Sequence, residues 1–255
     1  IADLIPSIKE YSFKITLFGM LATRLMMFLM RFSNKFIFEE MLIDDEFSFY
    51  FKCIILFSTL SIILVSKYSN ELDDEYRIEY NTLLLVVLLG MFLMTSSVNL
   101  IMIYLSLELV SIPSYILAGI LKNDKKSNEA SLKYVIFGSF ASGIMLYGMS
   151  WLYGISGSTN IYDVHLALLE SGNQLMIFIS LLFILVGFGY KISMVPFHYW
   201  APDVYEGAST PVTAFFSIGP KAAGFAILIR VIYSLFTEDG GLSSTTTLYG
   251  VNWPL

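Results

Sequence analysis

Two ionisable residues lie in long apolar stretches of the chain and are suited to proton transfer. Glu108 is the only charged residue between Asn99 and Lys122, and Lys191 lies late in another apolar stretch. A charge in hydrocarbon is costly, so an ammonium group placed there needs a partner or a function. Burial favours the neutral form of both groups, whereas a nearby opposite charge favours the charged forms. The two residues therefore predict a proton-handling pair inside a membrane.

Simpler roles are open to both residues. Glu108 can be a protonated, hydrogen-bonded structural carboxyl, and Lys191 can extend its ammonium group to the membrane interface, as lysines near helix ends do. Against the second role, the sequence after Lys191 stays apolar and aromatic, and Pro196 interrupts the helical hydrogen bonding. A helix break beside a buried cation is typical of internal sites in membrane proteins. We therefore favour a functional role for both.

Two further residues extend the candidate site. His198 follows Lys191 by seven residues, or two helical turns, and would share its face if the helix continued. Neutral imidazole both accepts and donates a proton, so His198 is a candidate relay, although a structural histidine near the interface fits equally well. Lys221 follows Pro220 in the last apolar stretch, so a proline again loosens a helix beside a lysine. We expect proton transfer to use Glu108, Lys191, His198 and Lys221.

Other polar residues are predicted to be structural. His165 is expected to be a solvated histidine in a polar connection over residues 155–173, and Arg230 an interfacial anchor. Asp203 and Glu206 stand beside a proline and a glycine, and we expect them to shape a loop.

Composition indicates a membrane protein without a cofactor of its own. The chain of 255 residues is 56% hydrophobic and 14% charged, against about 25% charged residues in soluble domains. Its net charge is −6, and no basic patch indicates nucleic-acid binding. Cys53 is the only cysteine, so the sequence offers no intrachain disulfide and no cysteine set for zinc or an iron–sulfur cluster.

Seven apolar stretches are long enough to cross a bilayer as helices, which takes about 20 residues each. They cover residues 11–30, 47–66, 82–98, 100–121, 133–154, 174–200 and 211–235. They are too long and too uniformly apolar for the strands of a membrane barrel, so we expect an all-α membrane protein. Lysines cluster after the fourth stretch, and the positive-inside rule places that connection in the cytoplasm or the mitochondrial matrix.

One long motif resembles a known family. The segment from Val195 to Lys221 reads VPFHYWAPDVYEGASTPVTAFFSIGPK. It resembles the antiporter-like membrane subunits of respiratory complex I, and within them the subunit 2 type, which is called subunit N in bacteria. The segments LSLEL at 105–109 and EASLKY at 129–134 match the same family. The resemblance covers about residues 45–235.

The resemblance implies a fold of inverted five-helix repeats, the first of which carries a buried Glu–Lys pair and a broken helix. Glu108 then matches the paired glutamate and Lys191 the lysine on the broken helix, while His198 matches the nearby relay histidine. Lys221 matches the lysine that leads towards the membrane centre.

The same resemblance predicts three regions. We expect N-terminal transmembrane helices and acidic loops over residues 1–81, one five-helix antiporter-like repeat over 82–235 and an exposed C-terminal extension over 236–255. Family members usually carry a second five-helix repeat. The sequence is therefore expected to be a truncated chain or the product of a split gene, with a separate chain supplying that repeat.

The implied function is that of a proton-translocating membrane-arm subunit of respiratory complex I, which couples NADH:ubiquinone electron transfer to proton pumping. The resemblance places no cofactor on this chain; FMN, iron–sulfur clusters and ubiquinone belong to partner subunits. The other membrane-arm subunits and lipids are the expected partners. The expected location is the mitochondrial inner membrane, with the bacterial plasma membrane as the alternative. Two other functions are a subunit of a Na⁺/H⁺ antiporter complex and a structural half-subunit that only scaffolds the membrane arm.

Overall fold

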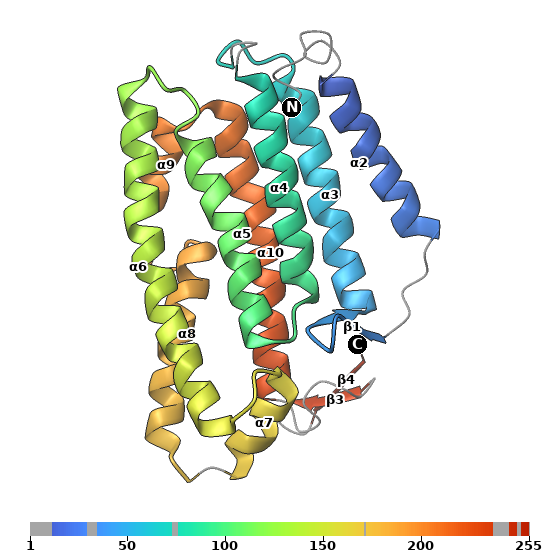
Figure 1. The fold of residues 1–255 in the computed structure, drawn as a ribbon, viewed down its shortest axis with the longest axis vertical. Coiled ribbons are helices and arrows are strands. Elements are labelled where there is room, and N and C mark those ends of the chain that lie inside the picture. Colours follow the sequence, from blue (N-terminus) through green and yellow to red (C-terminus); the bar gives the residue numbers. More distant parts are fainter. Residues whose placement is uncertain are drawn as a thin grey trace.

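The computed structural model describes residues 12–29, 35–72, 76–170, 172–236, 245–248 and 251–254. Long helices lie side by side in a bundle, with two short antiparallel hairpins at one end (Figure 1). In chain order the described elements are α2 (Ser12–Leu29), β1 (Lys35–Ile37), β2 (Leu42–Asp44), α3 (Glu46–Ser66), α4 (Arg77–Ser96), α5 (Leu100–Ala118), α6 (Lys125–Ser156), α7 (Ile161–Glu170), α8 (Gln174–Lys191), α9 (Trp200–Gly207), α10 (Thr210–Phe236), β3 (Thr245–Leu248) and β4 (Val251–Pro254).

Six helices of the described part are long and apolar enough to cross a membrane, namely α3, α4, α5, α6, α8 and α10. The predicted all-α membrane fold is therefore confirmed. The first predicted span, 11–30, forms the helix α2, which carries Lys14 and Arg24 and is not one of these six. Of the predicted extension 236–255, the structure describes the end of α10 and the backbone of β3 and β4; its exposure lies outside the described residues.

Side chains at the helix starts explain several boundaries. Asp45 caps α3 by accepting from the backbone N–H of Ser48, whose hydroxyl completes a capping box. Asn99 and Asp124 cap α5 and α6 by accepting from backbone N–H groups two residues on. Gly157 ends α6 with a φ of 70°, a left-handed conformation that glycine adopts without steric cost. The bundle therefore reverses direction at positions that its own sequence marks.

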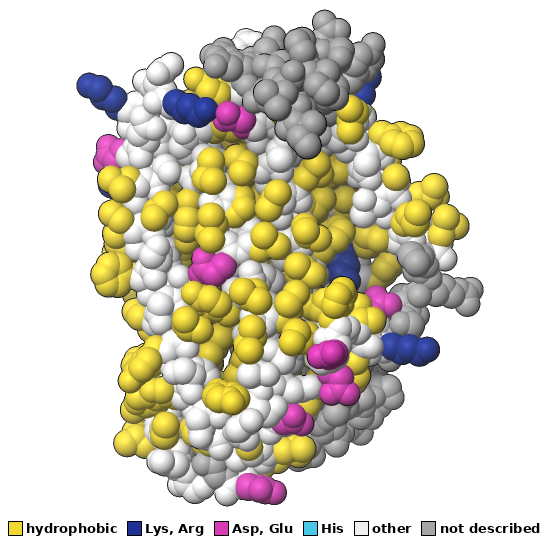
Figure 2. Space-filling view, in the orientation of Figure 1, with side chains coloured by type: hydrophobic (Ala, Val, Ile, Leu, Met, Phe, Trp, Pro, Cys, Tyr) yellow, Lys and Arg dark blue, Asp and Glu magenta, His cyan; other side chains and the backbone are white. Residues whose placement is uncertain are grey.

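Helix α10 lies at the centre of the bundle and contacts α3, α4, α5, α7 and α8. Helix α6 covers the other side of α5 and packs closely on α8, where a side chain at Gly148 would come within 2.6 Å of the Ser180 carbonyl oxygen. Small residues at such crossings allow helix backbones to approach in a membrane. Figure 2 shows hydrophobic side chains spread over the middle of the visible face, interrupted by few charged ones.

Candidate functional site

The last long helix before α10 breaks inside the bundle, and Lys191 is its final residue. Helix α8 ends at Lys191, a turn follows, and α9 begins at Trp200 (Figure 1). Within the turn, the backbone N–H of Met194 donates to Gly189 O at 2.7 Å, and Ser193 has a positive φ of 59°. The predicted span over 174–200 is therefore broken, as expected, but its helix ends earlier than the sequence indicated. The helix stops five residues before Pro196, the residue that predicted the break.

Lys191 is buried within the bundle, with 4% of its surface exposed. Its Nζ donates a hydrogen bond to the hydroxyl oxygen of Ser111 on α5, at 3.0 Å. Its ammonium group is therefore held inside the bundle. The alternative role, in which Lys191 extends to the membrane interface, does not hold in this structure. A buried amine of this kind depends on polar partners within the protein.

Glu108 lies on α5 one turn before Ser111 and is partly buried. Ser111, the residue that Lys191 contacts, is thus its neighbour on the surface of α5. The two side chains form no ion pair within 4.0 Å, and the buried Oε1 of Glu108 has no hydrogen-bond partner within the part of the chain that the structure describes. The structure thus places the two predicted residues on neighbouring helices, one helical turn of α5 apart through Ser111, without a direct contact.

His198 lies in the turn between α8 and α9 and is partly buried. Because α8 ends at Lys191, the helix does not continue to His198, and the condition for placing both side chains on one helical face is not met. The His198 ring stacks on Tyr199 with ring centroids 5.0 Å apart. Its buried Nδ1 makes no hydrogen bond to any described residue.

Lys221 lies on α10 and is partly buried. Helix α10 continues through Pro220, so this proline does not break its helix. Helix α8, in contrast, ends before it reaches Pro196. The Nζ of Lys221 lies 5.2 Å from the centre of the Tyr205 ring on α9, which is the geometry of a cation–π contact. Lys191 and Lys221 thus lie on adjacent helices but have different surroundings, one a hydroxyl and the other an aromatic ring.

An aromatic cluster that the sequence analysis missed fixes the break. The indole N–H of Trp200 donates to the Tyr190 carbonyl oxygen at 3.0 Å, and the Tyr190 hydroxyl donates to the Tyr134 carbonyl oxygen at 2.9 Å. The Tyr134 ring stacks on Trp200 with centroids 4.5 Å apart. Carbonyls at the end of a helix lack intrahelical partners. The cluster supplies one partner and joins α6, α8 and α9 beside Lys191.

Asp203 and Glu206 lie on a helix rather than in the predicted loop. The carboxylate of Asp203 pairs with Lys133 on α6 at 2.6 Å, and that of Glu206 pairs with Lys126 at 2.9 Å. The hydrogen bond from Lys126 lowers the pKa of Glu206 below its ordinary value. The two pairs connect α9 to α6 at the end of the bundle where the lysines cluster.

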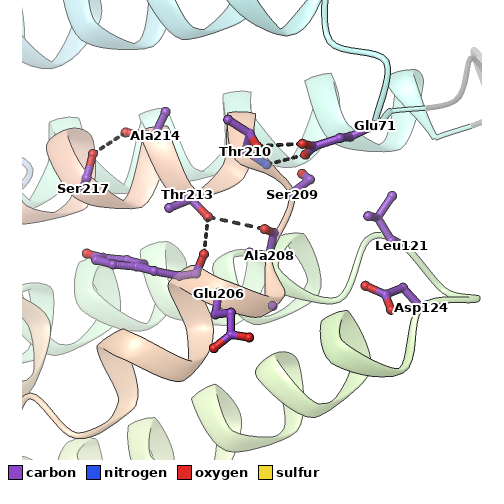
Figure 3. A pocket seen from close by; sticks show the side chains of 12 residues that line it. Glu71, Leu121, Asp124, Glu206, Ala208, Ser209, Thr210, Thr213, Ala214 and Ser217 are labelled. Atoms are coloured by element: carbon purple, nitrogen blue, oxygen red, sulfur yellow. Dashed lines mark hydrogen bonds between the residues drawn. The ribbon is translucent and has the colours of Figure 1, made fainter.

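A cavity of about 600 Å³ opens beside these pairs, between α9, the start of α10 and two connections (Figure 3). Glu71, from the connection between α3 and α4, accepts from the backbone N–H of Thr210 at 2.6 Å and from its hydroxyl at 2.7 Å. The wall also includes Tyr205, whose ring contacts Lys221, and the buried Ser209, whose hydroxyl has no partner among the described residues. Tyr205 thus connects the wall of the cavity to the lysine of α10.

Two predicted surface residues are buried at the opposite end of the bundle. His165 lies on α7 with 4% of its surface exposed, and its Nδ1 is 2.9 Å from the Leu235 carbonyl oxygen. Arg230 is also buried and binds Asp45 through two parallel hydrogen bonds of 2.8 and 2.9 Å. It further donates to the Thr95 carbonyl oxygen. The solvated histidine and the interfacial anchor are therefore both corrected to buried structural roles.

Residues 97–248 match the model of a family described as NADH:quinone oxidoreductase/Mrp antiporter, transmembrane. The chain belongs to this family. NADH-quinone oxidoreductase subunit N of Anaeromyxobacter sp. (strain Fw109-5) is 43% identical over 232 residues, which cover 86% of this chain and 44% of that relative. The resemblance predicted from the motif is confirmed, and the chain spans less than half the length of this relative.

Two solved assemblies contain similar chains. A chain of respiratory complex I from Thermus thermophilus with bound aureothin has a TM-score of 0.72 and 27% identity, covering 92% of this chain and 52% of its own length. A chain of the Mrp complex from Dietzia sp. DQ12-45-1b has a TM-score of 0.62 and 26% identity, covering 76% and 35%. Together with the six apolar helices, these matches identify a multi-pass membrane protein of the antiporter-like fold.

Proposed function

We propose that this chain forms the N-terminal part of a proton-translocating membrane subunit of NADH:quinone oxidoreductase, that is, respiratory complex I. The subunit N relative and the Thermus thermophilus structure support the choice of complex I. We assign residues 1–81 to the N-terminal helices, 82–235 to the five-helix repeat and 236–255 to a C-terminal extension. The observation that carries the proposal is the buried Lys191 amine at a helix break, bonded to Ser111 one helical turn from Glu108.

Charge separation within the Glu108–Lys191 pair is the proposed working step. When quinone reduction in neighbouring subunits shifts charge, the interaction weakens and Lys191 releases its proton. His198 lies in the turn that follows Lys191 and leads to α9, and its Nδ1 has no partner among the described residues. It is therefore the proposed relay towards Lys221 on α10. The low dielectric of the interior makes each of these charge changes energetically coupled to the next.

The proposed partners follow from the same assignment. Electrons pass through other subunits, which bind the FMN, the iron–sulfur clusters and ubiquinone, and the second five-helix repeat is supplied outside these 255 residues. The other membrane-arm subunits and lipid surround the bundle. The location is an energy-converting membrane, either the mitochondrial inner membrane or the bacterial plasma membrane, and the bacterial relatives favour the latter.

A second candidate function is that of a subunit of a Na⁺/H⁺ antiporter complex. The likeness to a chain of the Mrp complex and the shared family model favour it. Purification of the native assembly discriminates between the two functions. Flavin and iron–sulfur absorbance in the purified particle supports complex I, whereas sodium-dependent proton exchange without these chromophores supports the antiporter.

The decisive variant is Lys191→Ala, measured in the assembled complex in sealed vesicles. We expect NADH-driven proton uptake to be lost while assembly persists, because the buried amine is the group that changes charge. Lys126→Ala is the matched control, since it removes a lysine whose side chain is 69% exposed and paired at the surface. Undiminished pumping in both Lys191→Ala and Glu108→Gln would replace the proposal by a purely structural role.

A further inference from the structure

Ser111 contacts the Lys191 amine through its hydroxyl group, which also bonds to its own helix. Its O–H donates to the Leu107 carbonyl oxygen at 2.7 Å, along its own helix. A serine hydroxyl has one proton to donate and two lone pairs. An ammonium group only donates, so the Ser111 oxygen accepts from Lys191 Nζ. Ser111 is therefore fixed as an acceptor directed at the amine.

A second acceptor lies one turn away on the same helix. Glu108 precedes Ser111 by three residues, and side chains at this spacing are neighbours on a helix surface. The Glu108 Oε1 is buried and makes no hydrogen bond to a described residue. Helix α5 thus presents a carboxylate and a hydroxyl to one amine, and the amine contacts the hydroxyl.

The first part of the Lys191 side chain is enclosed by α10. A Cβ at Gly224 would lie 3.5 Å from Lys191 Cγ and 2.8 Å from Ile192 Cγ2, so α10 approaches this part of the chain closely. The first carbons of the side chain are therefore held against α10.

We infer that Ser111 is a positioning residue for proton transfer, whose hydroxyl holds the Lys191 amine while its ion pair with Glu108 is open. This inference rests on the proposed function of the Glu108–Lys191 pair. An ammonium separated from its carboxylate in a low-dielectric interior is unstable without another acceptor. The hydroxyl provides a neutral acceptor at that stage, so the amine remains in place to receive or release a proton.

The test compares three Ser111 variants with a control in the assembled complex, by NADH-driven proton uptake in sealed vesicles. Ser111→Ala removes the acceptor, and Ser111→Cys replaces it with a weakly accepting thiol. We expect both to lower the pumping rate about tenfold, equivalent to about 1.4 kcal/mol. Ser111→Thr keeps a hydroxyl and is expected to retain the rate within about threefold, which a loss of packing alone would not explain.

Ser114→Ala is the matched control. Ser114 is fully buried on the same helix, and its hydroxyl donates to the Val110 carbonyl oxygen at 2.6 Å, four residues back as in Ser111. Its only hydrogen bond in the described structure is this one, so we expect its removal to leave pumping within about threefold of the unaltered complex.

Two results separate this inference from the function on which it depends. If Lys191→Ala pumps normally, the proposed function fails, and the role of Ser111 with it. If Lys191→Ala is inactive but Ser111→Ala pumps as fast as Ser114→Ala, only the role of Ser111 is overturned. If Ser111→Ala does not assemble, the comparison of Ser111→Cys with Ser111→Thr replaces it. Equal pumping rates for these two variants overturn the inference. A slow Cys variant together with an active Thr variant supports it.

Discussion

The buried ion pair between Arg230 and Asp45 makes a quantitative prediction about stability. The side chains are 6% and 22% exposed, and the guanidinium makes two hydrogen bonds to the carboxylate and two to the Thr95 carbonyl oxygen. Removal of one partner of a buried pair typically costs about 3–5 kcal/mol, because the other charge is left uncompensated. We therefore expect Arg230→Met to lower the free energy of unfolding by about 4 kcal/mol.

The loss for Asp45→Asn is expected to be smaller, about 2–3 kcal/mol, since asparagine keeps the shape and Arg230 keeps its bonds to Thr95. The double variant should be close to Arg230→Met alone, which gives a coupling energy of at least about 2 kcal/mol. Unfolding by SDS in mixed micelles, followed by tryptophan fluorescence, measures all three variants. Strict additivity of the two substitutions would refute the claim that the pair acts as a unit.

The pH dependence of this pair has a definite sign. Although burial opposes ionisation of Asp45, the Arg230 guanidinium and the Ser48 backbone N–H together lower its pKa below the ordinary value. The stabilisation is thus fully present above the unfolded pKa of about 3.9. It is lost as the pH falls through the lower pKa of the folded state. The stability difference between the unaltered protein and Asp45→Asn should therefore be constant at neutral pH and shrink only in strong acid.

Three further substitutions test the packing around the site. Gly207→Ala should separate α9 from α6, because its Cβ would lie 2.5 Å from the backbone oxygen of Lys126. We expect a lower yield of assembled complex on native gels, and normal assembly would contradict this contact. Glu71→Ala removes an acceptor from the N–H of Thr210 and should cost about 1 kcal/mol in the same SDS titration, as the loss of a helix cap does; an unchanged midpoint would exclude a capping role. Gly224→Ala places a methyl group against Ile192 and Lys191, at the break after α8. We expect it to slow proton uptake more than it reduces assembly. Equal losses in both assays would show a general packing defect.

The fold class was predictable because its signal is local. Each membrane helix is encoded by a continuous apolar stretch, and the candidate spans of the structure fall within or around the predicted ones. Boundaries were predictable where a cap lies next to the helix, as with Asn99 before α5. The break after α8 was placed too late, since Pro196 is visible in sequence whereas the hydrogen bond from Trp200 to Tyr190 exists only in the folded chain.

Long-range partners account for the other errors. The sequence predicted an interfacial Arg230 because its partner Asp45 is 185 positions away. It predicted a solvated His165 because the Leu235 carbonyl oxygen beside its ring is 70 positions away. For the candidate site, the residue types identified Glu108 and Lys191. The hydroxyl that binds the amine carried no distinguishing signal, because serines are also common as structural residues in membrane helices.

The two ion pairs between α6 and α9 have a consequence for how the assembly responds to its medium. With eight residues, α9 is too short to be a stable helix by itself. Part of its attachment comes from carboxylates that face water at Asp203 and Glu206. Attraction between exposed charges weakens as ionic strength rises, with a Debye length of about 8 Å at 0.15 M salt. The short helix beyond the break should therefore be held less firmly in concentrated salt, while the long helices that bury apolar surface are unaffected.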